Sequence, residues 1–167
     1  RRESFGPPLQ ETLRAVDEIA VRFPDIHIVF PVHPNPNVRQ QAHERLAARS
    51  NIHLIEPLDY VNFSHLMNRA EIILTDSGGV QEEAPSLSKP VLVLRETTER
   101  PEGVEAGVAR LVGTNRGLIV EEVSRLLTDQ SYRDSMTGRP NPYGDGQAAT
   151  RIVRRLRQRL MTAEGST

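Results

Sequence analysis

Short apolar runs alternate with longer amphipathic stretches along almost the whole chain, and this alternation constrains the fold more than any other feature. Strands are predicted at residues 25–32, 52–55, 72–74, 90–94 and 110–112, and helices at 7–23, 37–48, 60–68, 80–87, 118–127 and 147–160. The run at 90–94 is apolar throughout, which is typical of a strand covered on both faces. The pattern predicts an α/β fold: a Rossmann-like, three-layer, doubly wound parallel sheet with right-handed crossovers.

The composition is that of one ordinary folded domain. The chain has 167 residues, a net charge of −1 and no cysteine. The near-neutral charge argues against general binding of nucleic acid or membrane surfaces. The lack of cysteine excludes disulfide and thiolate chemistry and fits the cytoplasm. No apolar run approaches the roughly 18 residues of a membrane span. Because the chain begins at Arg1 in charged, motif-like sequence, we expect it to be part of a longer protein.

The segment 71–83 carries the strongest indication of a binding site. An apolar run ends at Thr75-Asp76, turns over Ser77-Gly78-Gly79 and enters a predicted helix. Backbone N–H groups and the helix dipole at such a turn favour phosphate, and glycine lets an anion approach without meeting a Cβ. Glu83, one helical turn further on, suits ribose hydroxyls. A plain helix cap made by Asp76 or Ser77 is the alternative interpretation.

Two further polar loops follow predicted strands, and parallel strands would bring all three loops to one edge of the sheet. His33 lies between prolines, and residues 95–103 carry two arginines and two threonines. Arginine beside an anion-binding turn suits a diphosphate. Solvated loops are the alternative interpretation for both. Phe63 is interpreted by default as a core residue. The alternative is that its ring forms an apolar wall against a nucleobase.

Several common catalytic patterns are missing from the sequence. No two histidines have metal-ligand spacing with a third donor, so we predict no metal. There is no nucleophile elbow and no Cys–His pair. The glycine turn matches neither the dinucleotide pattern G-x-G-x-x-G nor the P-loop pattern, which weighs against a standard NAD or ATP domain.

Taken together, several segments resemble the non-hydrolysing bacterial UDP-N-acetylglucosamine 2-epimerases. They occur in order and with natural spacing, at residues 33–39, 57–60, 75–85, 95–107 and 143–146. The family has two Rossmann-like domains in a glycosyltransferase-like, phosphorylase-type arrangement. Residues 1–167 resemble the carboxyl-terminal, UDP-binding domain, with 147–167 as a terminal helix and tail. The amino-terminal half, to which the resemblance assigns the groups that move the C2 proton, is absent.

The resemblance implies a reaction and a site. Full-length members are expected to be cytoplasmic homodimers that interconvert UDP-N-acetylglucosamine and UDP-N-acetylmannosamine by eliminating and re-adding UDP, without metal or redox cofactor. Matched to this chain, the UDP-binding residues are Phe63 at the uracil, Glu83 at the ribose, Ser77, Gly78 and Gly79 at the diphosphate, and Arg100 near the phosphates.

The resemblance also implies an activator, a second UDP-N-acetylglucosamine contacting Arg1, Glu3 and His33. Because the acid–base groups for C2 would lie in the absent half, we expect a UDP-binding fragment with little or no activity alone. Two other interpretations stay open. One is the nucleotide-sugar domain of a glycosyltransferase, and the other is a stand-alone UDP-sugar-binding module.

Overall fold

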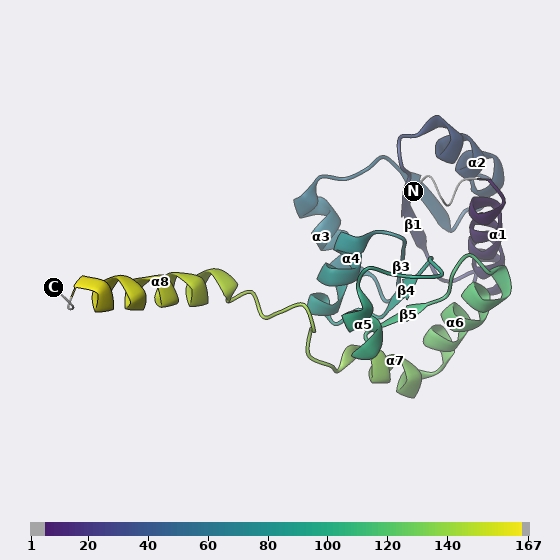
Figure 1. Ribbon diagram of the computed structural model, residues 1–167. Helices are drawn as coiled ribbons and strands as arrows, with labels where there is room; N and C mark the ends of the chain where they lie inside the picture. Colours follow the sequence, from purple (N-terminus) through teal and green to yellow (C-terminus); the bar gives the residue numbers. More distant parts are fainter. Residues whose placement is uncertain (1–5, 165–167) are drawn as a thin grey trace.

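The computed structural model describes residues 6–164, and within them strands and helices alternate as predicted (Figure 1). The elements are α1 (Pro7–Arg22), β1 (Ile28–Pro31), α2 (Pro36–Leu46), β2 (Ile52–Ile55), α3 (Tyr60–Arg69), β3 (Ile73–Thr75), α4 (Gly78–Glu83), the 3-10 helix η2 (Ala84–Leu87), β4 (Val91–Val93), α5 (Pro101–Glu105), β5 (Ala109–Leu111), α6 (Arg116–Thr128), α7 (Gln130–Thr137) and α8 (Ala148–Glu164). Every predicted strand and helix is present, and no boundary differs from its prediction by more than four residues.

The strand pairing is parallel throughout the described residues, as predicted. Strand β1 pairs with β2, with Ile28 opposite Ile52. Separately, β4 lies between β3 and β5, with Val91 opposite Ile73 on one side and Ala109 on the other. The backbone hydrogen bonds therefore form two ladders, where the alternation alone predicted one sheet.

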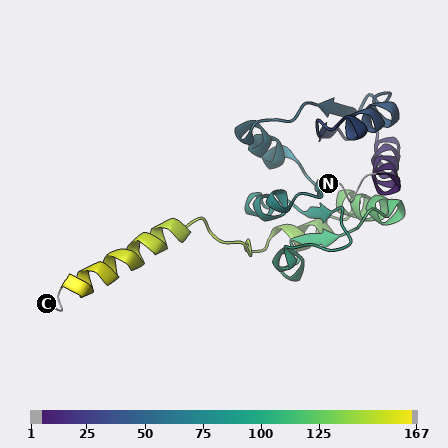
Figure 2. The same ribbon diagram turned by 45° about the horizontal axis from the view of Figure 1, so that its top comes forward.

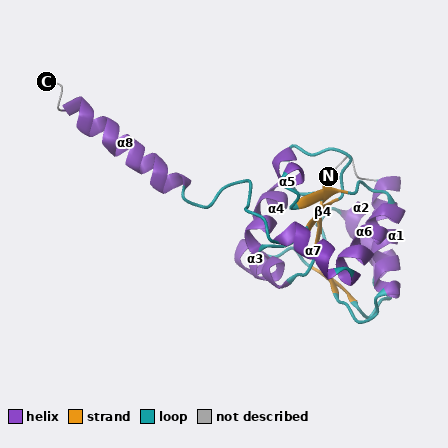
Figure 3. Ribbon diagram, turned by 90° about the horizontal axis from the view of Figure 1, so that it is seen from below, coloured by secondary structure: helices purple, strands orange, loops and turns teal. Residues whose placement is uncertain are grey.

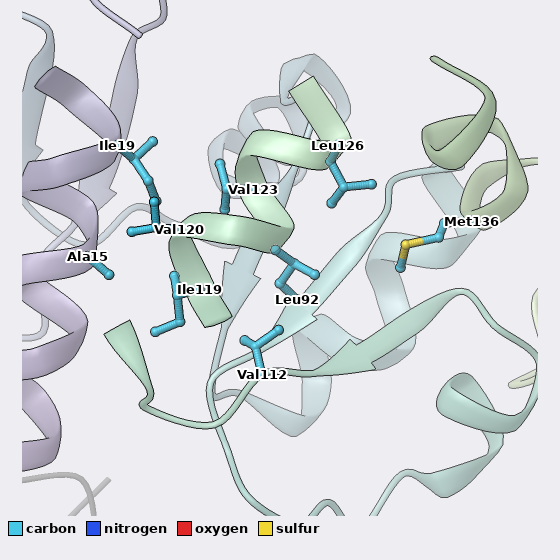
Figure 4. Packing of buried hydrophobic residues seen from close by; sticks show 9 residues of the cluster. All are labelled: Ala15, Ile19, Leu92, Val112, Ile119, Val120, Val123, Leu126 and Met136. Carbon is cyan, nitrogen blue, oxygen red and sulfur yellow. The ribbon is translucent and has the colours of Figure 1, made fainter. Parts of the chain in front are cut away.

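The helices cover both faces of the β3–β4–β5 ladder, which gives the three layers that were predicted. Leu92 packs with side chains of α1 and α6 in one buried cluster (Figure 4). Its neighbours Val91 and Val93 pack with residues of α3 and η2 in another. All three β4 side chains are completely buried, which explains their unbroken apolar run. Helix α1 also joins the two ladders, because Leu13 and Ala20 pack in a third cluster with β1 and β2.

Two helices were not predicted, and both have a physical reason to form. Helix α7 begins behind Asp129, whose carboxylate accepts a hydrogen bond from the backbone N–H of Tyr132. Helix α5 begins with Pro101, whose ring presets the backbone angle of a first turn. The predicted helix at 80–87 is divided in two, since Pro85 has no N–H and the chain tightens into η2.

Helix α8 projects away from the rest of the fold in all three views (Figures 1, 2 and 3). Its side chains from 148 to 160 are exposed, including Ile152, Leu156 and Leu160, which recur at a helical spacing of four residues. Within residues 6–164, no helix combines the length and the apolar character that a membrane crossing demands.

Candidate functional site

The turn after β3 leads directly into α4. Ser77 is the N-cap residue of α4, and its side chain makes no capping hydrogen bond. The backbone N–H of Ser77 instead donates to the Thr75 hydroxyl at 3.0 Å. Gly78 and Gly79 were predicted to lie in the turn, but they form the first turn of α4. That difference leaves their N–H groups at the helix start, where backbone donors lack partners inside the helix.

The Ser77 hydroxyl and the Glu83 carboxylate flank Gly79. A Cβ built on Gly79 would lie 3.9 Å from each of these two oxygen-bearing side chains, which is ordinary van der Waals contact. Packing within the protein therefore does not require glycine at this position. Ser77 and Gly79 are exposed and Glu83 is half-buried, so the structure brings these three predicted residues together on the surface.

A buried amide joins this turn to the loop after β4, and sequence reasoning did not assign it a role. Gln81 is 1% exposed. Its Nε2 group donates to the Ser77 carbonyl at 3.2 Å, and its Oε1 atom accepts from the Thr98 hydroxyl at 2.6 Å. An amide two residues after the glycine pair, with a threonine-bearing loop after the next strand, was the available indication of this link.

Arg100 contacts α4 through Glu82, and its side chain is paired with protein groups. Its Nε group donates to the Glu82 carboxylate, and its Nη1 group donates to the Glu99 carbonyl at 3.0 Å. The hydrogen bond and the negative charge of Glu82 raise the pKa of the Arg100 guanidinium. A ligand phosphate would therefore meet an arginine already held in place by Glu82.

The other arginine of the loop, Arg95, pairs with a carboxylate of the same loop. Arg95 is largely buried and donates through both Nη atoms to the Glu99 carboxylate, at 2.6 and 3.1 Å. This bidentate pairing, which an arginine can also make with a phosphate, is made here with a side-chain carboxylate of the same loop. Arg95 therefore shapes the loop that carries Thr98 and Arg100.

The Tyr143 hydroxyl makes two hydrogen bonds at the start of α5. Its hydroxyl accepts from the Gly103 N–H at 2.9 Å and donates to the Arg100 carbonyl at 3.1 Å. A Cβ on Gly103 would lie only 2.5 Å from that hydroxyl, so glycine is required here by close packing. Burial of the ring raises the pKa of Tyr143. Tyr143, the first residue of the 143–146 motif, thus contacts the backbone of Arg100.

Phe63 and His33 lie apart from this network of hydrogen bonds. Phe63 is half-buried on α3 and packs against the cluster that contains Met67 and Ala84. His33 is exposed after β1, and its Nδ1 atom accepts from the Asn35 N–H at 3.1 Å. Arg1 and Glu3 lie outside the described residues.

The rest of the described surface offers fewer features of a binding site. Among residues 6–164, no group of three or more histidine, aspartate and glutamate side chains could hold a metal ion. An open depression of about 500 Å³ lies at the amino ends of β3 and β4, away from the loops described above. It is lined by Glu71, Ser88, Lys89, Pro90, Arg133, Asp134, Thr137 and Gly138.

The fold and the loops define a class of protein: a doubly wound α/β domain with a glycine-bearing helix start at the carboxyl ends of parallel strands. In such domains ligands bind at that edge, and phosphates bind at helix starts. The sequence profile described as UDP-N-acetylglucosamine 2-epimerase matches residues 1–157. This chain belongs to that family.

Known proteins resemble the chain along nearly all of its length. The UDP-N-acetylglucosamine 2-epimerase of Escherichia coli K12 is 56% identical over 157 residues, which is 94% of this chain and 42% of the relative. The Staphylococcus aureus MnaA–UDP co-structure has a TM-score of 0.91 at 46% identity, covering 96% of this chain and 44% of that one. The Neisseria meningitidis UDP-GlcNAc 2-epimerase bound to UDP-GlcNAc has a TM-score of 0.90 at 46% identity, covering 95% and 43%. The chain therefore spans about two-fifths of the length of its relatives.

Proposed function

We propose that this chain is the UDP-binding part of a UDP-N-acetylglucosamine 2-epimerase. The observation that carries the proposal is the cluster of Ser77, Gly79 and Glu83, where a hydroxyl, an open glycine face and a carboxylate meet at the start of α4. Support comes from the solved relatives that hold UDP or UDP-GlcNAc while matching this chain closely in structure.

Each proposed contact matches the chemistry of UDP. The N–H groups at Gly78 and Gly79, with the Ser77 hydroxyl, would donate to the diphosphate, and Arg100 would add positive charge. The Glu83 carboxylate would accept from the ribose hydroxyls. Phe63 would offer the uracil its exposed part, since the rest of the ring packs in the core. UDP leaves as an anion in the proposed elimination, so donors at its β-phosphate would stabilise charge that grows in the transition state.

The complete reaction needs groups beyond this chain. We propose that the full-length protein interconverts UDP-N-acetylglucosamine and UDP-N-acetylmannosamine, with the C2 proton moved by residues of the remaining three-fifths of the enzyme. The activator contacts at Arg1, Glu3 and His33, the homodimer and the cytoplasmic location belong to the same proposal. A His33→Ala change in the full-length enzyme should reduce activation by UDP-N-acetylglucosamine while leaving UDP affinity of the fragment unchanged.

Calorimetric titration with UDP tests the binding proposal directly. Each of Ser77→Ala and Glu83→Ala removes a hydrogen-bonding group, so each should weaken UDP binding by about fivefold or more. Glu121→Ala is the matched control, because Glu121 is an exposed carboxylate on α6. Equal affinity of all three variants would contradict the assignment, as would absence of binding by the folded chain at millimolar UDP.

A further inference from the structure

We propose that Gln81 and Thr98 form a positioning link that holds the Ser77 turn and the Arg100 loop in register, so that both reach one diphosphate. The inference rests on the proposed function for its ligand. The link itself rests on contacts among four residues, Ser77, Gln81, Thr98 and Arg100.

The Gln81 amide has one orientation that satisfies its surroundings. The Ser77 carbonyl can only accept a hydrogen bond, so the nitrogen end of the amide must face it. The oxygen end then faces Thr98, where it accepts from the hydroxyl at 2.6 Å. Because Gln81 is 1% exposed, water cannot replace either partner without opening the structure.

The Thr98 hydroxyl both donates and accepts a hydrogen bond. It donates its hydrogen to Gln81, and its oxygen accepts from the Arg100 N–H at 3.0 Å. A chain of hydrogen bonds therefore runs from the Ser77 carbonyl through Gln81 and Thr98 to the Arg100 backbone. It joins residues that are 23 positions apart in the sequence and that follow two different strands.

Two other contacts fix Arg100, and they make the link effective. The Tyr143 hydroxyl holds the Arg100 carbonyl, and Glu82 holds its guanidinium. Arg100 is thus held at its N–H, its carbonyl and its side chain. Binding is strengthened when groups that contact one ligand are already placed, since less freedom is lost on association. A link between the turn and the loop gives the diphosphate two prearranged sides.

The link is tested with threonine variants of the 167-residue chain. Thr98→Val keeps the shape and removes the hydroxyl, Thr98→Ser keeps the hydroxyl, and Thr97→Val is the matched control at an exposed neighbour. UDP affinity, melting temperature and amide hydrogen exchange at Ser77 and Gln81 are measured for each. Gln81→Met serves as the second variant, because methionine fills a similar volume without donating.

We expect Thr98→Val to weaken UDP binding about fivefold, and Thr98→Ser and Thr97→Val to bind like the unchanged chain. Thr98→Val should also speed exchange of the Ser77 and Gln81 amide hydrogens, across the link. With Gln81→Met the losses should not add, since both changes break one chain. A lower melting temperature with unchanged UDP affinity would mean a structural role only and would overturn the proposal.

The exchange measurement separates this inference from the proposed function. If the unchanged chain does not bind UDP, the proposed function fails. The link between the turn and the loop is then supported if Thr98→Val speeds amide exchange at Ser77 and Gln81 beyond the effect of Thr97→Val. It is overturned if those two amides exchange at unchanged rates.

Discussion

At the scale of single residues, two glycines illustrate different reasons for lacking a side chain. A Cβ on Gly79 would make only ordinary contacts, at 3.9 Å, with Ser77 and Glu83. Gly113 has a φ of +58°, and a Cβ there would fall on the Glu96 carboxylate. The first glycine leaves a surface open, and the second is favoured by its backbone conformation.

We therefore expect opposite results from Gly79→Ala and Gly113→Ala. Gly79→Ala should keep the melting temperature and weaken UDP binding by about tenfold, because its methyl group would occupy the face that we propose for the diphosphate. Gly113→Ala should lower the free energy of unfolding by about 1–3 kcal/mol, because a positive φ is unfavourable for alanine. Thermal unfolding and UDP titration of both variants provide the check. A clear loss of stability in Gly79→Ala would show that the fold itself needs that glycine.

Alternation and residue chemistry in the sequence were enough to predict where the loops after β3 and β4 lie, but not which side chains pair within them. The strand-end positions of Ser77 and Arg95 follow from alternation and parallel pairing. The pairing of Arg100 with Glu82 and of Arg95 with Glu99 does not follow, since several charged partners lie at similar distances along the chain. Which carboxylate an arginine meets depends on loop conformation, which periodicity does not determine.

At the scale of elements, α5 depends on a tyrosine that comes 40 residues after Gly103. The Tyr143 hydroxyl makes two hydrogen bonds to the α5 start, so Tyr143→Phe should destabilise it by about 1–2 kcal/mol. It should also speed amide exchange at Gly103 while exchange at Leu126 of α6 stays unchanged. Similar exchange at Gly103 in both proteins would contradict the bracing role.

The same tyrosine gives a pH dependence with a definite sign. Burial raises the folded-state pKa of Tyr143 above its ordinary value of 10.0, and the phenolate cannot donate to Arg100. The unfolded chain therefore ionises first as the pH rises. The contribution of Tyr143 to stability is present below pH 10 and is lost as the pH rises from there through the folded pKa. Chemical unfolding between pH 8 and about 11 should show a smaller decline in Tyr143→Phe. Tyr132 keeps part of the decline in both proteins, because burial raises its pKa as well.

The strands give a second prediction at this scale. Backbone N–H groups alternate between neighbours along a parallel strand. The Ile73 N–H points toward β4, since it donates to the Pro90 carbonyl. The N–H of Leu74 therefore points away from β4, whereas Leu92 lies in a strand paired on both sides. Amide hydrogen exchange should be faster at Leu74 than at Leu92. Equal protection would mean that a further chain segment or molecule pairs with β3 in solution.

At the scale of the whole molecule, the division into domain and projecting helix was only partly predictable. A terminal helix was predicted at 147–160 and is present as α8, but its described side chains, including the apolar ones, are exposed. Periodicity predicts that a helix has an apolar face, and it does not say which surface covers that face. The fold of the domain without α8 was more predictable. A strand that is buried on both faces, such as β4, has an unbroken apolar sequence, and this sequence indicates the burial.

Because α8 projects from the domain, removing residues 148–167 should leave the fold and the site intact. The ion pair between Arg151 and Asp145 joins two exposed side chains, and such pairs stabilise proteins by at most about 1 kcal/mol. We expect the chain ending at residue 147 to melt within about 3 °C of the full chain and to bind UDP with equal affinity. Thermal unfolding and titration of both chains provide the measurement, with Leu156→Gln as a control that keeps the helix. A fall of more than about 8 °C on truncation, without a similar fall in UDP affinity, would show that α8 folds back onto the domain in solution.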